Sequence, residues 1–385
     1  MQSKNSILIK ERFKEYAIRN NFKYQDSMPI IAPQNSKLLF NISGGVIFQD
    51  ELLEKKNAVN KNVASIQKCL RTDNLNSIGV SGRHHILFNM LGHFMFYNAN
   101  EKETKNTFIE FAYSFLTKEL QLDDKRIFVT VHPDDIVTAN VWKKLGKSNL
   151  IETNKNIFIS PYANKSALRT EILWRKTDNS LVELWNLVFT QFDSKVPFEK
   201  PSIKIAADSG VSLERIVSAI ENKNNNYENS MWNEYVNYIK KYGNGSYDIS
   251  QYRRIADLSN ASIELIREGI QPGNKIQSYM LRKLMRTFFD LCDFDNINPE
   301  KILNYNKLDE NCINVFKKER IIYFKSIQKG LIQAKKQIDK FGIENLDKNN
   351  LKSTYGLSEM YISKIISRIK HQNKVKNEID LDRDM

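Results

Sequence analysis

The sequence predicts an α+β domain over residues 1–225, followed by an all-α domain over residues 226–385. Two observations support this division. Short runs rich in β-branched and aromatic residues, bounded by Gly, Asn, Pro or Asp, recur in the first part with few helical stretches between them. After the polar loop at residues 223–226, apolar residues recur at helical spacing almost to the end of the chain. Strands followed by a run of helices are typical of an α+β domain joined to a helical one.

The first part is expected to open with an amphipathic helix over residues 7–20, because Ile9, Phe13 and Ala17 share one face. Two further helices are predicted, at residues 106–119 and 136–145. The strand-like runs lie at residues 37–40, 86–90, 126–131, 156–160, 172–174, 184–192 and 202–206. In the second part, helices are predicted at residues 228–242, 251–268, 276–292, 312–340 and 359–370.

Composition narrows the class of protein. Of the 385 residues, 41% are hydrophobic, and no apolar run approaches the roughly 20 residues that span a bilayer. The N-terminus lacks the apolar centre of a signal peptide. Cys69, Cys292 and Cys312 are far apart and odd in number, which suits a reducing compartment and excludes a cysteine-only zinc site. We therefore expect a cytoplasmic protein with no membrane segment and no zinc site.

The formal net charge of +13 favours a polyanionic partner, because lysine and arginine neutralise phosphates and release counterions. Charge alone fits a generally lysine-rich proteome equally well. The distribution is more informative, since the basic residues concentrate after residue 230. A basic helical half is the pattern expected of an RNA-binding module.

The common nucleotide-binding fingerprints are absent. The chain contains no GxxxxGK[ST] loop, no GxGxxG turn and no HExxH helix. A nucleotide would therefore need arginines that pair with its phosphates and aromatic rings that stack on its base.

Two early segments have suitable residues. Residues 66–71 are apolar and end in Arg71, and residues 82–92 begin with Gly-Arg-His-His and include Phe88. Their separation suits a hairpin. His84 and His85 have a simpler interpretation as buried hydrogen-bonding residues, and as a pair they make a poor metal site because a strand would point them to opposite faces.

Two later segments complete the set. Residues 183–192 are predicted to form a buried strand that carries Glu183 and Asn186. Residues 208–215 are predicted to be a strand end, a turn and a helix start, with Ser209 as the helix cap and Gly210 allowing close backbone approach. Taken singly, each residue has a structural explanation: Arg71 as an ion-pair partner, Asp208 as a helix-initiating carboxylate, Phe88 and Val188 as core.

In this order, the segments resemble the alanyl-tRNA synthetases. Residues 37–50 are similar to the first motif of that family, residues 67–71 and 83–92 to its second, and residues 208–215 to its third; residues 183–192 resemble its alanine-pocket strand. In the helical half, residues 254–257, 272–283 and 354–356 resemble its tRNA-recognition helices. The resemblance covers nearly the whole chain.

The resemblance implies a class II catalytic domain, an antiparallel sheet flanked by helices, that joins alanine or another small amino acid to AMP from ATP with Mg²⁺. Catalysis would be positioning and charge stabilisation, without a general base. The residues implied are Arg71 and Arg215 for catalysis; Arg71, Arg83, His84, Phe88, Glu183 and Arg215 for ATP; Phe158, Asn186, Val188, Asp208 and Gly210 for the amino acid; and Glu183 for Mg²⁺. For tRNA, expected to be the alanine tRNA, they are Asn274, Arg282, Lys283, Arg286 and Ser353.

The sequence also departs from the family. The hairpin between Arg71 and Arg83 is shorter, Phe158 replaces a pocket tryptophan, Asn89 a glutamate, and Ser353 an aspartate that reads the acceptor stem. The editing and C-terminal oligomerisation domains lack counterparts, so we expect a monomer whose fidelity either depends on editing in trans or is low. Three hypotheses stay open: a minimal alanyl-tRNA synthetase, a paralogue that passes the activated amino acid to another acceptor, and a non-catalytic RNA-binding relative.

Overall fold

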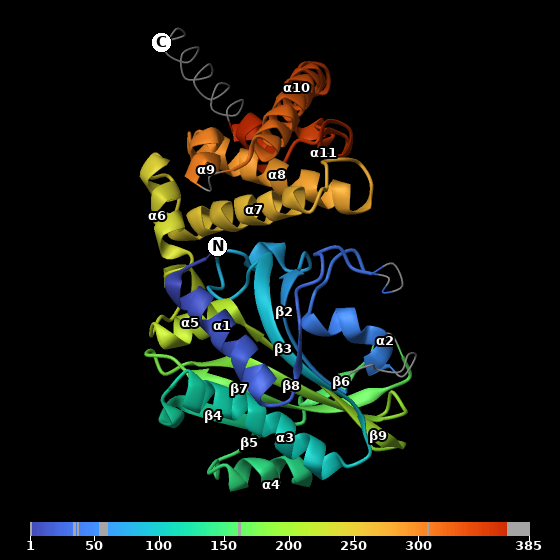
Figure 1. The fold of residues 1–385 in the computed structure, drawn as a ribbon. Coiled ribbons are helices and arrows are strands. Elements are labelled where there is room, and N and C mark those ends of the chain that lie inside the picture. The colour runs from blue at the N-terminus through green and yellow to red at the C-terminus, as the bar shows by residue number, and fades with distance from the viewer. Residues whose placement is uncertain are drawn as a thin grey trace, which may run out of the picture. The chain divides into compact units, whose positions relative to one another are not determined.

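The computed structural model describes residues 2–33, 36, 38–53, 61–160, 163–305 and 308–367. These residues form two compact units (Figure 1). Unit 1 comprises Met1–Lys240 and Asp248–Ala261, and unit 2 comprises Lys241–Tyr247 and Ser262–Met385. The last described strand ends at Ser212, and the compact units divide the chain further on than the boundary expected between residues 225 and 226.

The described residues of unit 1 form a nine-stranded, mainly antiparallel sheet of order β1-β2-β3-β9-β8-β7-β4-β5, with β6 paired to β7. The strands are β1 (Lys23–Gln25), β2 (Asn62–Leu70), β3 (Leu87–Asn98), β4 (Ile127–Val131), β5 (Ile151–Glu152), β6 (Ile157–Ile159), β7 (Ser166–Arg175), β8 (Leu181–Phe192) and β9 (Pro201–Ser212). The predicted α+β class is confirmed.

Most predicted strands exist, but the central ones are longer than the apolar runs that indicated them. Strands β3, β7 and β9 continue through polar residues, since one face of each points toward the candidate site rather than into the core. The predicted strand at residues 37–40 is wrong for its described part, where Phe40 makes a single bridge to Ile31. Lys37 lies outside the described residues.

One face of the sheet is covered by α1 (Lys4–Arg19), α3 (Glu101–Ser114) and α4 (Ile136–Lys144). The core lies between them. Phe13 of α1 packs on Trp185, with ring centroids 6.4 Å apart, and Phe108 of α3 packs on Phe189 at 5.7 Å. Because side chains alternate along a strand, Asn186 and Val188 of β8 point to the opposite face. That face holds the candidate site.

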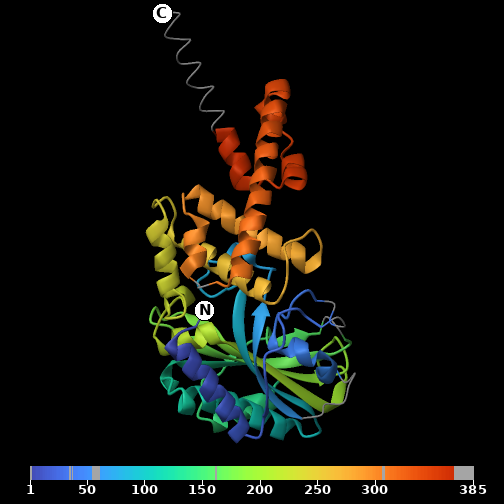
Figure 2. The same cartoon turned by 45° about the horizontal axis from the view of Figure 1, so that its top comes forward.

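Unit 2 is helical, as predicted. It contains the end of α7 (Ile249–Arg267), followed by α8 (Ile276–Phe294), α9 (Pro299–Tyr305), α10 (Glu310–Phe341) and α11 (Lys348–Tyr355). A further helix covers residues 359–367, and the rest of the helix predicted there lies outside the described residues. Figure 2 shows these last helices beside α10, where Ala334, Leu351 and Leu357 share a small core. No helix among the described residues is long and apolar enough to cross a membrane.

Candidate functional site

The predicted amino-acid-binding residues meet on neighbouring strands. In the register of β8 and β9, Asn186 lies opposite Gly210 and Val188 lies opposite Asp208. All four therefore share the face that the helices leave open. Phe158 is on β6, opposite Ala167 of β7, and its side chain is 42% exposed.

Asp208 is the most distinctive group on this face. Among the described residues it has no hydrogen-bond or ion-pair partner, and burial raises its pKa to about 7. Two glycines lie near it. A Cβ on Gly45 would be in ordinary contact with the Asp208 Oδ2 atom, at 3.8 Å, whereas a Cβ on Gly210 would lie only 2.6 Å from the Met90 sulfur. This part of the face therefore holds one uncompensated acid, which suits a small ligand that carries an ammonium group.

Arginines surround the neighbouring part of the site. Arg215 is on α5 (Leu213–Ile220), and its Nη1 donates to the carbonyl oxygen of Glu183 at 2.7 Å. Arg71 follows β2, donates from Nε to the carbonyl of Ile42 at 2.8 Å, and stacks over Phe88 with its guanidinium 5.1 Å from the ring centroid. The exposed side chain of Arg83 has no hydrogen-bond or ion-pair partner within the described part of the chain.

The electrostatics show that these cations act on one another. Burial lowers the pKa of Arg215, and Arg83 and Arg71 lower it further, while Glu183 opposes the shift. Burial, followed by Arg83 and Arg215, also lowers the pKa of His84. A cavity of about 350 Å³ adjoins Arg83 and Arg215 and is also lined by Lys176. The site is thus positive and suited to phosphates.

The predicted turn between Asp208 and the next helix is wrong. Strand β9 continues to Ser212, and α5 begins at the next residue. Ser212, not Ser209, is the helix cap, accepting a bond from the Arg215 amide at 3.4 Å. Ser209 points to the core side of the sheet, where its hydroxyl lies 2.6 Å from Nδ1 of His93.

Sequence reasoning missed Glu214. Its side chain is buried, with 1% of the residue exposed, and Oε1 accepts bonds from the Asn89 amide at 3.0 Å and from Asn89 Nδ2 at 3.3 Å. Oε2 accepts a bond from the Ser212 hydroxyl at 2.7 Å. Glu214 thereby joins the helix of Arg215 to the strand of Phe88. Its place beside Arg215 in an amphipathic helix was the available signal, but it does not reveal the partner strand.

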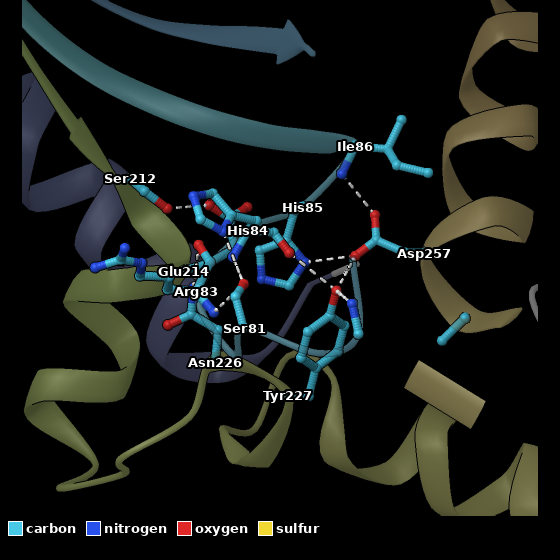
Figure 3. A network of polar contacts seen from close by, with 12 residues as sticks. Ser81, Arg83, His84, His85, Ile86, Ser212, Glu214, Asn226, Tyr227 and Asp257 are labelled. Carbon is cyan, nitrogen blue, oxygen red and sulfur yellow. Dashed lines mark hydrogen bonds and ion pairs between the residues drawn. The ribbon is translucent and has the colours of Figure 1, made fainter. Parts of the chain in front are cut away.

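The two adjacent histidines have separate roles. Both precede β3, so they are not on a strand as expected. His84 is partly buried, and its Nδ1 lies 2.7 Å from the Ser81 hydroxyl. His85 is buried, stacks on Trp232 with centroids 4.6 Å apart, and has its Nδ1 2.7 Å from Oδ2 of Asp257 (Figure 3). His85 is therefore the buried, hydrogen-bonding histidine that the sequence allowed.

Carboxylates that could hold a metal ion are few. Glu183 is 3.5 Å from Arg215 Nη1 and lies near Glu171 of β7, whose pKa is raised by burial and by the Glu183 charge. No group of three or more His, Cys, Asp or Glu side chains suited to a metal occurs among the described residues. A magnesium ion here would share two carboxylates with the phosphates of a ligand, a common arrangement for that ion.

In unit 2, two of the predicted RNA-binding residues, Arg282 and Arg286, share one buried carboxylate. Glu319, 2% exposed, accepts a hydrogen bond from Nε of Arg286 at 2.9 Å and forms an ion pair with Arg282, whose Nε lies 3.2 Å away. Arg282 also donates to Asn274 Oδ1 and, at 3.3 Å, to the carbonyl of Pro272.

The two remaining predicted residues of this surface are open to solvent. Lys283 and Ser353 are both exposed, and the Ser353 hydroxyl donates to the Asn349 carbonyl at 2.8 Å. Arg282 is thus engaged within the protein, whereas Lys283 remains available to a ligand.

The chain is similar to known tRNA synthetases. The family model for class II (A) tRNA synthetases matches residues 8–378. The alanine–tRNA ligase of Wolbachia pipientis wMel is 31% identical over 294 residues, which are 72% of this chain and 33% of that protein. The enzyme of the same name from Ehrlichia chaffeensis is 31% identical over 309 residues, covering 74% and 34%. The one from Mesomycoplasma hyopneumoniae strain 232 is 28% identical over 324 residues, covering 74% and 36%.

The chain spans about a third of the length of these relatives. Among solved structures, apo histidyl-tRNA synthetase of S. aureus is similar over 56% of this chain and 65% of that one, with 12% identity and a TM-score of 0.39. That likeness is too weak to add to the family match.

Proposed function

The chain belongs to the class II (A) family of tRNA synthetases, and on this basis we propose that it activates alanine with ATP and transfers the alanyl group to a tRNA. The arrangement of charges on the open face of the sheet carries the proposal. Asp208 lies on this face and has no hydrogen-bond or ion-pair partner among the described residues, while Arg71, Arg83 and Arg215 gather positive charge on another part of the site. An ammonium group and a polyphosphate are the ligands that this pattern complements.

The pocket accounts for the amino acid. The alanine ammonium pairs with the Asp208 carboxylate, and its methyl group lies against Val188 and Asn186. The Met90 sulfur keeps this region small. It lies against Gly210, so close that a Cβ at that position would be 2.6 Å from it. The Asn186 Oδ1 atom is buried and has no hydrogen-bond partner among the described residues, so it is free to accept a bond from the ammonium.

The arginines account for the nucleotide and the first step. Phe88 and the Arg215 guanidinium hold the adenine between them, while Arg71 contacts the α-phosphate. A carboxylate oxygen of alanine attacks the α-phosphorus, a new P–O bond forms, and the bond to the bridging oxygen breaks as pyrophosphate leaves. No proton is transferred in this step, so stabilising and aligning two anions is the main requirement. Mg²⁺, bound by Glu183 and Glu171 with the phosphates, would neutralise charge on the leaving pyrophosphate.

The helical unit accounts for the second substrate. In the transfer step, a terminal ribose hydroxyl of the tRNA attacks the acyl carbon of alanyl-AMP, the bond from that carbon to the phosphate oxygen breaks, and AMP leaves with the hydroxyl proton on its phosphate. Lys283 is exposed and basic, and Asn274 is exposed with its Oδ1 engaged by Arg282, which leaves the Asn274 amide hydrogens to donate to an RNA base. We expect the alanine tRNA to be the partner, since the curated relatives named above are alanine–tRNA ligases.

The test is amino-acid-dependent ATP–pyrophosphate exchange with each of the twenty amino acids, followed by acylation of total tRNA. We expect exchange with alanine and a labelled alanine tRNA. Exchange without charging would replace the proposed acceptor with another molecule. Absence of exchange with every amino acid would overturn the proposal and favour a non-catalytic RNA-binding protein.

A further inference from the structure

The segment that carries Arg83 and His84 is packed tightly against α7. Gly79 has a φ of +80°, and a Cβ there would lie 2.2 Å from the carbonyl oxygen of Ser250 and 3.0 Å from the amide of Arg254. No side chain fits in that space, so the connection between β2 and β3 comes as close to the helix backbone as glycine permits. This contact fixes the first end of the segment Gly79–Ile86.

The second end of the segment is held by Asp257, a completely buried residue of α7. Its Oδ1 accepts a bond from the Ile86 amide at 2.8 Å. Its Oδ2 lies 2.7 Å from Nδ1 of His85 and accepts a bond from the Tyr227 hydroxyl at 2.6 Å (Figure 3). Three donors from two parts of the chain therefore compensate the buried carboxylate, which is what a stable buried charge requires.

The network is continuous with the glycine contact. The Tyr227 hydroxyl accepts a bond from the Gly79 amide at 3.2 Å while it donates to Asp257. Burial, together with the Asp257 charge, raises the pKa of Tyr227 well above its usual value, so its hydroxyl stays a donor. The His85 ring is held against Trp232, at 4.6 Å, and against the Tyr227 ring, also at 4.6 Å. Asp257 thus binds both ends of the segment, directly at Ile86 and through Tyr227 at Gly79.

The position of this anchor matters for the proposed ATP site. Asp257 accepts a hydrogen bond from the amide of Ile86, and strand β3 begins at the next residue, Leu87. Phe88 is the second residue of that strand. Arg83 and His84 lie between the two anchored ends, and the Arg83 charge adds to burial in lowering the pKa of both His84 and Arg215. A second attachment, from the Asn226 amide to the Gly82 carbonyl at 2.8 Å, holds the middle of the segment but not its junction with β3.

We propose that Asp257 is a positioning residue for ATP: by fixing Gly79–Ile86 on α7, it sets where Arg83, His84 and Phe88 stand relative to Arg215. This inference rests on the proposed function. Asp257 touches none of the reacting atoms, so its effect appears in the binding of the nucleotide and not in the binding of alanine, whose pocket is formed by β8 and β9.

The test compares two substitutions in the same helix. Asp257→Asn keeps the size of the side chain but removes its charge. It also places an NH2 donor where one carboxylate oxygen accepted a hydrogen bond, so at least one of the three bonds can no longer form as it does in the wild type. The matched control is Ser259→Ala, two residues along α7, where the hydroxyl lies 2.7 Å from that of Tyr235 on α6 (Asn233–Tyr242) and makes no contact with the segment. We expect Asp257→Asn to raise KM for ATP about tenfold or more and to leave KM for alanine within about twofold, as for a misplaced binding group. Ser259→Ala should lower thermal stability without changing either KM.

Tyr227→Phe provides an intermediate variant, since it removes one donor and keeps the ring packing. We expect a smaller rise in KM for ATP, in the same direction. Equal changes in both KM values, or a loss of stability alone in Asp257→Asn, would show a merely structural residue and overturn the inference. Binding of a non-hydrolysable ATP analogue, measured by calorimetry, separates the two proposals. If the wild type binds the analogue but shows no exchange, the proposed function fails, while a Kd weakened by Asp257→Asn and not by Ser259→Ala still supports the anchor.

Discussion

The open face of the sheet and the helical unit both gather arginines, but their neighbours differ. On the sheet face, Arg71 and Arg215 donate to backbone carbonyls, and the nearest carboxylate is Glu183, 3.5 Å from Arg215. In the helical unit, Arg282 and Arg286 share Glu319, and Arg320 pairs with Asp293 at 2.8 Å.

The difference distinguishes a surface that awaits its counter-charge from one that is already complete. On the sheet face, Arg71 and Arg83 still lower the pKa of Arg215 despite the Glu183 charge, and an arriving anion would relieve that repulsion. Asp208 is the complementary case, an acid without a described cation beside it. In unit 2 the same side-chain types are bound to each other and stabilise the fold. Predicting RNA contacts from arginine positions alone therefore selects residues such as Arg282, whose charge is already paired with a carboxylate inside the protein.

The largest expected effect concerns Asp208. Asp208→Asn should lower alanine-dependent pyrophosphate exchange by about 10³-fold, because the ammonium loses its charged partner. Burial raises the pKa of Asp208 to about 7, whereas in the unfolded chain the carboxyl titrates in its ordinary acidic range. At intermediate pH the folded state therefore keeps a proton that the unfolded state has already lost, so wild-type stability should fall as the pH rises toward 7, and the variant should lose this dependence.

Urea unfolding at a series of pH values measures this difference. At pH 8 the Asp208→Asn variant should be more stable than the wild type by about 1–3 kcal/mol. Retention of wild-type exchange would refute the pocket assignment.

Removal of a sheet-face cation should have the next largest effect. Arg215→Gln should lower kcat/KM for exchange by about 10²–10³-fold, the usual loss when one charge-stabilising group is removed. The matched control is Arg320→Gln in unit 2, which should leave exchange unchanged and reduce thermal stability by breaking the pair with Asp293. Steady-state exchange and thermal unfolding of both variants measure the contrast. Equal effects of the two substitutions on exchange would contradict the proposed role of Arg215.

The carboxylate of the helical unit should matter for folding. Glu319→Gln removes the charge shared by Arg282 and Arg286 and leaves two partly buried guanidinium groups without it. We expect the free energy of unfolding to fall by about 1–3 kcal/mol, since a buried charge network loses a partner. Chemical denaturation followed by circular dichroism provides the measurement. Exchange activity should be unaffected at temperatures where the variant is folded, and a fall in exchange would mean that the helical unit takes part in the activation step.

The smallest effect is expected at the solvent-exposed lysine. Lys283→Ala should weaken RNA binding several-fold and reduce the slope of log affinity against log salt concentration by about 1, the signature of one lost phosphate contact. Lys200→Ala, an exposed lysine of unit 1, serves as the control. Fluorescence anisotropy with an acceptor-stem RNA at several salt concentrations distinguishes them. Identical slopes for the two variants would remove Lys283 from the RNA surface.

Sequence patterns predicted the features that depend on local periodicity. Helices α7, α8 and α10 and strands such as β4 and β8 appear within a few residues of their predicted positions, because burial of one face leaves a regular repeat. The short helices α9 and α11 were not predicted. The cap of α5 was misassigned, since Ser209 and Ser212 are both good caps and only the length of β9 decides between them.

Contacts between distant residues left no such pattern. Asp257 and its partner His85 are 172 residues apart, and nothing in the local sequence of α7 shows that this acid points inward toward a loop. Glu214 and Asn89 are likewise 125 residues apart. The sequence therefore predicted the residues proposed to touch the substrates. It did not predict the side chains, such as Asp257 and Glu214, that hold those residues in place.

The sulfur of Met90 accepts a hydrogen bond from the Gly44 amide at 3.3 Å. It would lie 2.6 Å from a Cβ on Gly210. Its position at the amino-acid pocket makes it the point where oxidative damage would reach the activation step. Oxidation to the sulfoxide adds a polar oxygen and a new stereocentre to a side chain that has little room beside Gly210. The cysteines offer no alternative target, since Cys69, Cys292 and Cys312 are buried, and burial raises the pKa of each thiol. Peroxide sensitivity of this protein should thus follow its thioether chemistry, and a methionine sulfoxide reductase would reverse it.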